Sequence, residues 1–440
     1  MRAIVARLSA QPHETLGALA ELCYRYPTFY GFDYQASGVL VLKGENINRE
    51  GELVDVEEPS FISEEIHARF PLTHLELDDL IISVRGEVGK VGLISPRLAG
   101  SNINANTIRV ALKERVKGKD YEPRFIWLYL NSDLGQLLIG QFIAGGVQET
   151  ITAPELLEVM IPKLPHARQV KLVAAMDAAR AERRAKLVEA DALLAGLDGF
   201  LLATVGLTAP PKDNRKVYAA RRADVPARFD PHFHLPALAQ NTRMLTAGGA
   251  EPLGSLVSFS DEIWKPAKHE KPTFRYIEIS NVNPNTGEAC AEEVPVVEAP
   301  SRARMAVQTN DIIVSLTRPH HGSIAQITSD LNGCIASTGF SVLRGIEGSR
   351  LNREYLWCVL RSKMCLLQML QRASGGNYPA ITERELAKVL LPVPKPAVQE
   401  TIATEACRRR EAARRLRAEA ETDWQAAKQW FEEQLLGGVL

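Results

Sequence analysis

Residues 125–165 read FIWLYLNSDLGQLLIGQFIAGGVQETITAPELLEVMIPKLP, and residues 355–396 read YLWCVLRSKMCLLQMLQRASGGNYPAITERELAKVLLPVPKP. The second segment repeats the first at a displacement of 230 residues. The matched positions are Trp127 with Trp357, Gly145-Gly146 with Gly375-Gly376, Thr152 with Thr382, Leu156 with Leu386, and Pro162 with Pro392. Upstream, DLIISVRGEVGKVGLIS from Asp79 corresponds to DIIVSLTRPHHGSIAQIT from Asp311. A repeat of this length predicts two copies of one structural unit.

Each copy has the sequence features of an α+β domain. In the first copy DDLIISV, KVGLIS and TIRVAL are rich in β-branched residues, which is typical of strands, whereas FIWLYLNSDLGQLLIGQFI has helical spacing of its apolar residues. A double-glycine loop and a proline-bracketed strand follow in both copies. We therefore predict two related α+β domains of about 150 residues each in a pseudo-twofold arrangement.

A long helix is predicted after each copy. Residues 167–209 and 397–440 lack proline and are rich in Ala, Arg, Glu and Leu. Both contain apolar residues at alternating spacings of three and four, the a/d pattern of a coiled coil. The predicted seam is Val173, Met176, Leu187, Leu194, Leu197, Leu201, Ala403, Ala406, Trp424 and Phe431, interrupted by Arg180, Arg183, Arg410 and Arg417. Two helices with a shared seam are most simply paired as an antiparallel coiled coil, although one amphipathic helix on a globular body has a similar pattern over this span.

These features divide the chain into five segments. We expect a first domain at residues 1–165, a central spacer helix at 166–206 and a linker leading into the second domain at 207–247. The second domain is expected at 248–395 and the C-terminal spacer helix at 396–440.

Composition narrows the class of protein. No apolar run approaches the roughly 20 residues that cross a bilayer, and the first residues do not form a signal peptide, so we expect a soluble cytoplasmic protein without a membrane partner. The six cysteines form no C-x-x-C pair, which favours buried reduced thiols over a zinc ribbon or a disulfide framework. The net charge of −1 does not itself favour DNA binding, so clustered basic residues must supply phosphate contacts. Basic runs are present at 180–186, 215–222 and 408–417, although each is equally typical of a solvated helix face.

The layout resembles the specificity subunit of type I restriction-modification systems over nearly the whole chain. The resemblance is carried by the strand-turn motif DLIISVRGEVGKVGLIS, the loops AGGVQETIT and ASGGNYPAIT, the turns IPKLPHARQ and LPVPKPAVQ, and the long helix after each turn. Gln169 and Gln399 stand where that family has a glutamine at the start of the spacer helix. The second copy departs from the pattern, because SLTRPHHGSIAQI replaces the SVRGEVGKVGLI turn.

The resemblance implies a non-catalytic subunit that reads double-stranded DNA for partners in phage defence. Two target-recognition domains would each read a short block of bases, and the helical spacer would set the unread gap between them. The implied partners are two methyltransferase subunits, which use S-adenosylmethionine to methylate adenine, and in a full system motor-endonuclease subunits. This chain would itself need no cofactor.

Base readout needs side chains such as Arg, Asn and Gln presented from loops. In the first domain the candidates between apolar runs are Arg85, Lys90, Asn102, Asn104, Asn106 and Gln148. In the second domain they are Lys265, Lys268, Arg318, His320, His321, Asn377 and Tyr378.

No catalytic motif is found in the sequence. It has neither the Asn/Asp-Pro-Pro-Tyr/Phe motif of base methyltransferases nor a phosphate-binding G-x-x-x-x-G-K-[ST] loop, and NPNTG at Asn283 is typical of a turn. The pairs His232/His234 and His320-His321 lack further ligands at metal spacing, so no metal site is predicted. Two other readings remain open: a structural adaptor whose two domains hold proteins and never contact DNA, and an enzyme with its own endonuclease site.

Overall fold

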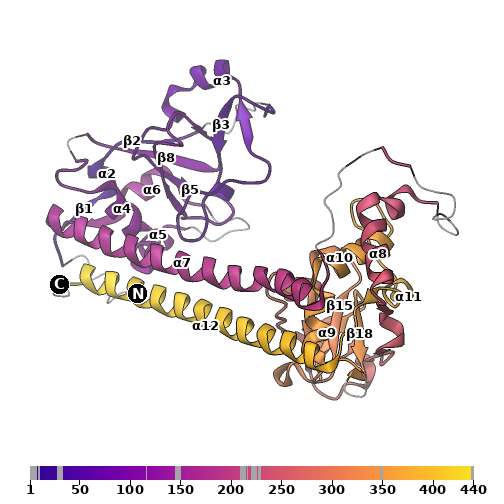
Figure 1. Cartoon of the computed structure of the whole chain (residues 1–440). Helices are drawn as coiled ribbons and strands as arrows, with labels where there is room; N and C mark the ends of the chain where they lie inside the picture. The colour runs from indigo at the N-terminus through magenta and orange to yellow at the C-terminus, as the bar shows by residue number, and fades with distance from the viewer. Residues whose placement is uncertain are drawn as a thin grey trace. The chain divides into compact units, whose positions relative to one another are not determined.

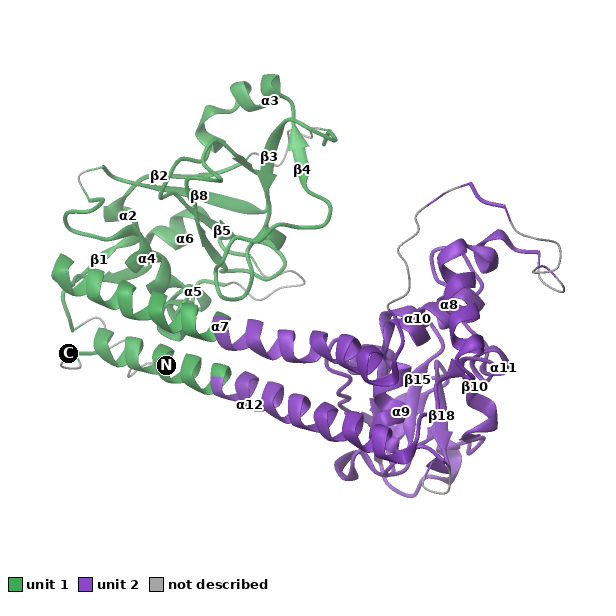
Figure 2. Cartoon of the chain, viewed as in Figure 1, with its two compact units in different colours: residues 1–184, 420–440 green, residues 185–419 purple. Residues whose placement is uncertain are grey.

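The computed structural model describes residues 10–26, 33–114, 116–143, 150–208, 229–346 and 350–437, with Arg7, Arg215, Val217, Tyr218, Ala219 and Val225. It separates into two compact units, of which the first contains both ends of the chain and the second is one continuous segment (Figures 1 and 2). Unit 1 comprises residues 1–184 and 420–440, and unit 2 comprises residues 185–419.

The globular part of unit 1 is built on three small sheets. The four-stranded sheet has the order β2-β8-β5-β6, the three-stranded sheet has the order β4-β3-β7, and β1 pairs with β9. The strands are β1 His13–Thr15, β2 Ala20–Arg25, β3 Val39–Leu42, β4 Ser60–Ile62, β5 Leu80–Ser83, β6 Val91–Leu93, β7 Asn102–Ile103, β8 Thr107–Leu112 and β9 Met160–Pro162. The helices are α2 Leu16–Leu19, α3 Glu64–Arg69, α4 Pro123–Leu130, α5 Asp133–Gly140 and α6 Ala153–Leu157.

Unit 2 has the same plan with additions. Its sheets have the orders β11-β18-β15-β16 and β13-β12-β17-β14, and β10 pairs with β19. The strands are β10 Glu251–Pro252, β11 Ser258–Phe259, β12 Thr273–Ile277, β13 Glu292–Pro295, β14 Ala303–Ala306, β15 Ile312–Ser315, β16 Ile324–Gln326, β17 Ile335–Ser337, β18 Phe340–Arg344 and β19 Leu390–Leu391. The helices are α8 Pro236–Ala247, α9 Arg353–Leu360, α10 Lys363–Arg372 and α11 Glu383–Leu386.

The repeated sequence therefore corresponds to a repeated fold. The sheets β2-β8-β5-β6 and β11-β18-β15-β16 have the same strand order. The second sheet of each unit contains one parallel pair, β3 with β7 in unit 1 and β12 with β17 in unit 2. Strand β14 and helix α8 have no counterpart among the described elements of unit 1. The predicted strands DLIISV, KVGLIS and TIRVAL are confirmed as β5, β6 and β8.

The segment predicted as one helix after β8 is a pair of helices. Its first helix, α4, ends near Asn131, and Ser132 caps the second helix, α5, by accepting a hydrogen bond from the Gly135 amide at 3.1 Å. A short helix that the prediction missed follows each glycine loop, and it begins after Thr152 in unit 1 and after Thr382 in unit 2. The threonine in each loop therefore has a local role, because its side chain caps that helix.

Two helices of 40 residues complete the fold: α7, His166–Val205, and α12, Pro396–Leu435. Within unit 1 the first half of α7 runs beside the second half of α12 in the opposite direction, since Arg168 bonds to Gln434 and Arg183 to Glu421. Within unit 2 the remaining halves do the same, since Arg417 bonds to Asp191 at 2.6 Å. The ten predicted seam residues are buried, except that Leu187 and Leu194 are half-buried.

Each globular part packs onto both helices of its unit. The main core of unit 1 includes Leu172 and Met176 of α7 and Trp424 and Phe431 of α12. The main core of unit 2 includes Leu197 and Leu201 of α7 together with Ile402 and Ala406 of α12. Hydrophobic burial therefore joins each domain to two helix segments that are distant in sequence. None of the helices in the described part of the chain is both long enough and apolar enough to span a bilayer.

Candidate nucleic-acid interface

Each domain is held at the start of a long helix by a buried glutamine. The Gln169 amide donates to the carbonyls of Asp120 and Leu164, both at 2.8 Å, and its oxygen accepts from the Glu122 amide at 2.9 Å. In unit 2, Gln399 makes the equivalent three bonds to Arg350, Pro394 and Asn352. Every partner is displaced by 230 residues. These glutamines, which the sequence placed at a shared position, therefore connect α4 and α9 to the helices that support them.

A basic hollow lies on the first domain between three loops. Its walls come from the β5–β6 turn, the loop before β8 and the short helix η1, Gly44–Asn46, and it is lined by Lys43, Gly44, Glu45, Arg85, Gly86, Glu87, Lys90, Asn104 and Asn106. The Val84 amide donates to the Asn106 carbonyl at 2.9 Å, so the turn and the loop are fixed to each other. Four of the predicted residues, Arg85, Lys90, Asn104 and Asn106, are thus brought together.

The cations of this hollow differ in whether they are already paired with a carboxylate. Lys43 pairs with Glu45 at 2.9 Å, and Lys90 pairs with Glu87 at 3.1 Å. Arg85 is exposed and makes no ion pair with another described residue. It lowers the pKa of the neighbouring Arg25, although burial of Arg25 has the larger effect. An exposed arginine beside other cations is suited to an anionic partner such as a phosphate or the acceptor edge of guanine.

Two predicted asparagines have structural roles. Asn102 was predicted in a loop, but it lies in β7, is fully buried and shares a hydrogen bond of 3.0 Å with the His67 ring. Asn104 is 8% exposed and its side chain accepts from the Asn106 amide at 3.0 Å, which closes the turn. Both predictions of base contact are therefore withdrawn, because a side chain with its polar groups bonded inside the domain is not presented to DNA. Gln148 lies outside the described residues.

The second domain presents a different arrangement. The loop after β15 joins the glycine loop, since the Arg318 amide donates to the Pro379 carbonyl at 2.7 Å. The Arg318 guanidinium lies over the Tyr378 ring at 4.4 Å and donates to the Asn377 carbonyl at 3.4 Å. Arg318 has a left-handed backbone with φ of 46°, which is rare for a residue with a side chain. Three predicted residues therefore share one surface, on which Asn377 and Tyr378 are exposed.

The other predicted residues of this domain are two lysines beside the second sheet and two histidines that follow Arg318 in the chain. Lys265 and Lys268 are exposed next to the second sheet, where Trp264 packs on Phe274 with ring centroids 4.5 Å apart. His321 is exposed, but His320 is partly buried and lines a cavity with Trp357 and Arg361. Burial lowers the pKa of His320, and so do the nearby His321, Arg318 and His232. Since the His320 ring lines this cavity and its lowered pKa disfavours the charged form, His320 is not kept among the proposed phosphate contacts.

The sequence reasoning missed two parts of these surfaces. Lys43 belongs to the hollow because its amide is bonded to the Asn46 side chain at 2.9 Å, which starts η1 beside the β5–β6 turn. Arg25 reaches the same loops by donating to the Ala105 carbonyl at 2.9 Å. Both residues precede the predicted loops by more than 40 positions, so no local pattern marked them.

Metal ligands and thiols of the described residues bear on whether the chain has chemistry of its own. Among them no three His, Cys, Asp or Glu side chains are grouped to hold a metal ion. Burial raises the pKa of the Cys358 and Cys365 thiols to about 12, which makes them poor nucleophiles. The expectation that all six thiols are buried is wrong for Cys290 and Cys407, which are exposed.

Comparison with known proteins agrees with the resemblance seen in the sequence. No family model matches the chain. The Type I restriction enzyme HindI specificity subunit of Haemophilus influenzae is 26% identical over 131 residues, which is 29% of this chain and 25% of the relative. The chain thus matches about a quarter of the length of that curated relative.

One solved structure extends the likeness of fold to the whole chain. A chain from a structure described as the basis of complex assembly and conformational transition of the type I R-M system aligns over 98% of both chains, with a TM-score of 0.53 and 19% identity. The HsdS subunit from Thermoanaerobacter tengcongensis aligns over 97% of both chains at a TM-score of 0.38 and 17% identity. The S subunit from M. genitalium aligns over 98% of this chain and 96% of its own, at a TM-score of 0.42 and 13% identity.

Proposed function

We propose that this chain is a non-catalytic specificity subunit, which reads a split DNA site for partner enzymes. Two methyltransferase subunits would bind it and methylate adenine with their own S-adenosylmethionine, and motor-endonuclease subunits would join in a full system. The resemblance to type I specificity subunits in sequence and fold supports this reading. We place the complex in the cytoplasm, where it meets both host and phage DNA.

The observation that carries the proposal is a duplicated domain on a shared pair of helices. Two copies of one sheet order are each anchored by an equivalent buried glutamine to antiparallel helix segments. We propose that α7 and α12 form one coiled-coil spacer between target-recognition domains at 1–165 and 248–395. A helix of 40 residues is about 60 Å long, which exceeds one turn of B-DNA. Such a spacer would keep two reading surfaces a fixed number of base pairs apart.

Each domain would read its block with a different set of side chains. In the first domain we propose Arg85 and Asn106, with Lys90 and Lys43 as phosphate contacts. In the second domain we propose Arg318, Asn377 and Tyr378, with His321, Lys265 and Lys268 on the phosphates. Arg and Asn can each make two hydrogen bonds to one base, to guanine and adenine respectively, so these residues are suited to direct readout.

Exchange of one domain tests the proposal most directly. We expect that replacing residues 1–165 with the corresponding domain of another specificity subunit changes one half of the methylated motif and leaves the other half and the adenine chemistry intact. Methylome sequencing of a host with the wild-type chain, the exchanged chain and no chain measures this. A change in both halves would contradict modular reading, and an unchanged methylome on deletion would refute the function.

Substitution of Arg85 tests the surface of the first domain. We expect Arg85→Ala in the complex with its methyltransferase partner to weaken binding of the cognate duplex by about 10- to 100-fold if it contacts a base. If it contacts only phosphate, binding weakens on every sequence and the salt slope of log affinity decreases by about one. Fluorescence anisotropy over a salt series distinguishes the two. Arg97→Ala, which removes an exposed arginine paired with Asp55, is the matched control and should have no effect.

The salt series also separates this function from a protein adaptor. A DNA reader that contacts several phosphates loses affinity steeply as salt rises. The adaptor hypothesis, which the net charge of −1 favours, instead predicts absent or salt-insensitive binding in the presence of the partner. A purified chain that nicks plasmid with magnesium would favour the endonuclease reading, and we expect no nicking.

A further inference from the structure

Two arginines that interrupt the apolar seam occupy equivalent positions in the repeat. Arg180 of α7 lies over the Trp127 ring at 4.3 Å, and Arg410 of α12 lies over the Trp357 ring at 4.1 Å. Both the arginines and the tryptophans are displaced by 230 residues. Each pair joins a long helix to the first helix of a globular domain, α4 or α9. The same contact has therefore been retained in both copies although most side chains around it differ.

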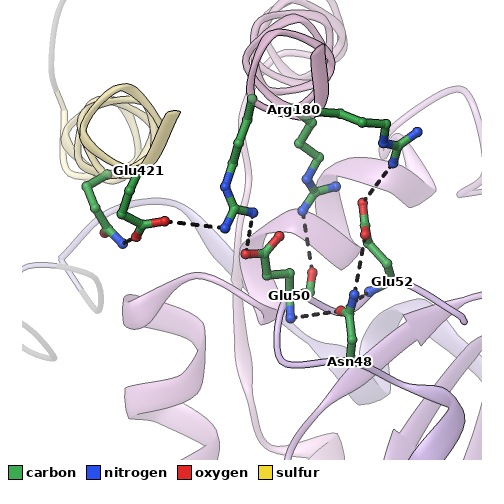
Figure 3. A network of polar contacts seen from close by, with 8 residues as sticks. Asn48, Glu50, Glu52, Arg180 and Glu421 are labelled. Atoms are coloured by element: carbon green, nitrogen blue, oxygen red, sulfur yellow. Dashed lines mark hydrogen bonds and ion pairs between the residues drawn. The ribbon is translucent and has the colours of Figure 1, made fainter. Parts of the chain in front are cut away.

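In unit 1 Arg180 also belongs to a polar network that includes Glu50 of the domain and Glu421 of α12 (Figure 3). Arg180 points to the Glu50 carbonyl at 3.5 Å and also lies over Trp424 of α12 at 5.3 Å. The next turn of α7 adds Arg183, which bonds to the Glu50 carboxylate at 2.6 Å and to Glu421 of α12 at 3.3 Å. Arg183 of α7 thus links this loop of the domain to α12.

That loop is itself rigid. The Asn48 side chain accepts from the amides of Glu50 and Glu52, both at 2.9 Å, and Arg184 contacts the Glu52 carboxylate at 3.5 Å. Gly51 has φ of 77°, and a Cβ there would meet the Asn131 side chain at 2.4 Å. The Trp127 indole donates to the carbonyls of Gly51 and Val91, both at 3.0 Å. The ring under Arg180 is therefore fixed to the loop and to strand β6, whose hairpin carries Arg85 and Lys90.

In unit 2, Arg410 also joins the domain to its long helix, but through different partners. Arg410 donates to Glu354 of α9 at 2.8 Å and to Gln326 of β16 at 3.3 Å. Arg414, one turn later on α12, pairs with Glu288 at 3.1 Å, as Arg184 pairs with Glu52. Arg361 lies 5.0 Å from the Trp357 ring and donates to the carbonyls of Gly322 and Pro284. In unit 1 Arg180 contacts two rings, the second of which Arg183 also contacts at 5.6 Å, whereas in unit 2 both cations contact the Trp357 ring.

Stability alone does not account for an arginine in these positions. Burial lowers the pKa of Arg180, since a charged group loses hydration there, and an apolar residue would continue the seam without that cost. A buried polar group in a helical seam instead serves to select one arrangement of the packed elements over its alternatives. Planar guanidinium groups suit this role, because stacking and hydrogen bonding both depend on direction.

We propose that the Arg180–Trp127 and Arg410–Trp357 stacks fix the orientation of each recognition domain on its helix pair and thereby set the gap length that the protein accepts between its two base blocks. The inference rests on the proposed function. The two arginines are positioning residues that do not contact DNA. Loss of either stack leaves the base-reading loops intact but lets one domain tilt on the helices, so sites with altered gaps become acceptable.

The test measures affinity for duplexes that keep both base blocks and change the gap by one base pair. The gap is first read from the methylome, and the protein is the full chain in complex with its methyltransferase partner. For Arg180→Met and Arg410→Met we expect the preference for the native gap over the longer one to fall by about tenfold, or ~1.4 kcal/mol. Arg180→Lys should behave like Arg180→Met, because lysine keeps the charge but lacks the planar group.

The control variant is Arg408→Met on α12, since the one ion-pair partner of Arg408 among the described residues is Glu405 of its own helix, at 2.7 Å. It should keep the native gap preference. Unchanged gap preference in both Arg180→Met and Arg410→Met, or uniform weakening on all gaps, would show that the stacks only stabilise the fold and would overturn the inference. A wild-type complex that ignores the split motif would instead refute the proposed function.

Discussion

Replacing Gln399 by leucine should lower the free energy of unfolding of unit 2 by about 3 kcal/mol or more. Gln399 is 2% exposed, and its amide satisfies the Asn352 amide at 2.8 Å and the carbonyls of Arg350 and Pro394 at 3.1 and 2.9 Å. Leucine fills a similar volume but leaves these three backbone groups without partners, and each unpaired buried group costs about 1–3 kcal/mol. Chemical denaturation, monitored by hydrogen exchange and mass spectrometry, assigns the loss of stability to residues 185–419.

The matched substitution is Gln429→Leu on the same helix. Gln429 is exposed, and its side chain bonds, within the part of the chain that the structure describes, to Glu433 one turn away at 3.1 Å, so its loss should cost less than about 0.5 kcal/mol. Gln169→Leu should destabilise unit 1 to the same extent as Gln399→Leu destabilises unit 2, because its three bonds are equivalent. A loss below about 1 kcal/mol for both buried glutamines would contradict their role as anchors.

Replacing Asp79 by alanine should destabilise unit 1 by about 3–5 kcal/mol, because it leaves the buried Arg109 with only the exposed Glu76, 3.5 Å away, as an ion-pair partner among the described residues. Asp79 is 1% exposed at its side chain and pairs with Arg109, which is 6% exposed, at 2.6 Å. The pair joins the start of β5 to β8. These strands carry the β5–β6 turn and the loop before β8, so we also expect DNA affinity to fall with the loss of order. Denaturation and anisotropy on the same preparation measure both effects.

An exposed pair provides the comparison. Asp55→Ala removes the partner of Arg97, and these side chains are 82% and 60% exposed, so the change should be within about 1 kcal/mol. The double substitution Asp79→Leu with Arg109→Met should recover most of the stability, because no charge is then left unpaired. If Asp79→Ala lowers the free energy of unfolding no more than Asp55→Ala does, the Asp79–Arg109 pair does not organise the domain. Asp311 and Arg344 form the corresponding pair in unit 2 at 2.8 Å and should respond in the same way.

Much of the candidate site could be predicted because it lies in loops beside recognisable strands. Arg85, Asn106, Arg318, Asn377 and Tyr378 were chosen as polar residues between apolar runs, and the structure places them on accessible loops of the two domains. Alternation of apolar residues marks strand ends, and the connections between strands run over the surface. Which of these side chains contact bases stays a prediction.

The same reasoning fails where a loop residue bonds inward. Asn102 and Asn104 are as polar as Asn106 and only a few residues away, yet Asn102 bonds to His67 and Asn104 closes its own turn. His320 faces a cavity lined by Trp357, whereas its neighbour His321 is exposed. Burial of a polar side chain depends on partners 35 or more residues away in two of these cases, and composition does not encode their position.

The amino-acid sequence by itself determined the duplication, the α+β character of each copy, the two long helices and the glutamine that begins each of them. These follow from local periodicity and from repetition, which are properties of neighbouring residues. Only the tertiary structure decided what the seam arginines do, since Arg180 meets Trp127 and Glu50, and Arg410 meets Trp357 and Glu354. In the sequence, an arginine at an apolar position only interrupts the apolar pattern of the seam. Its structural role depends on which distant aromatic ring and carboxylate the fold brings close to it.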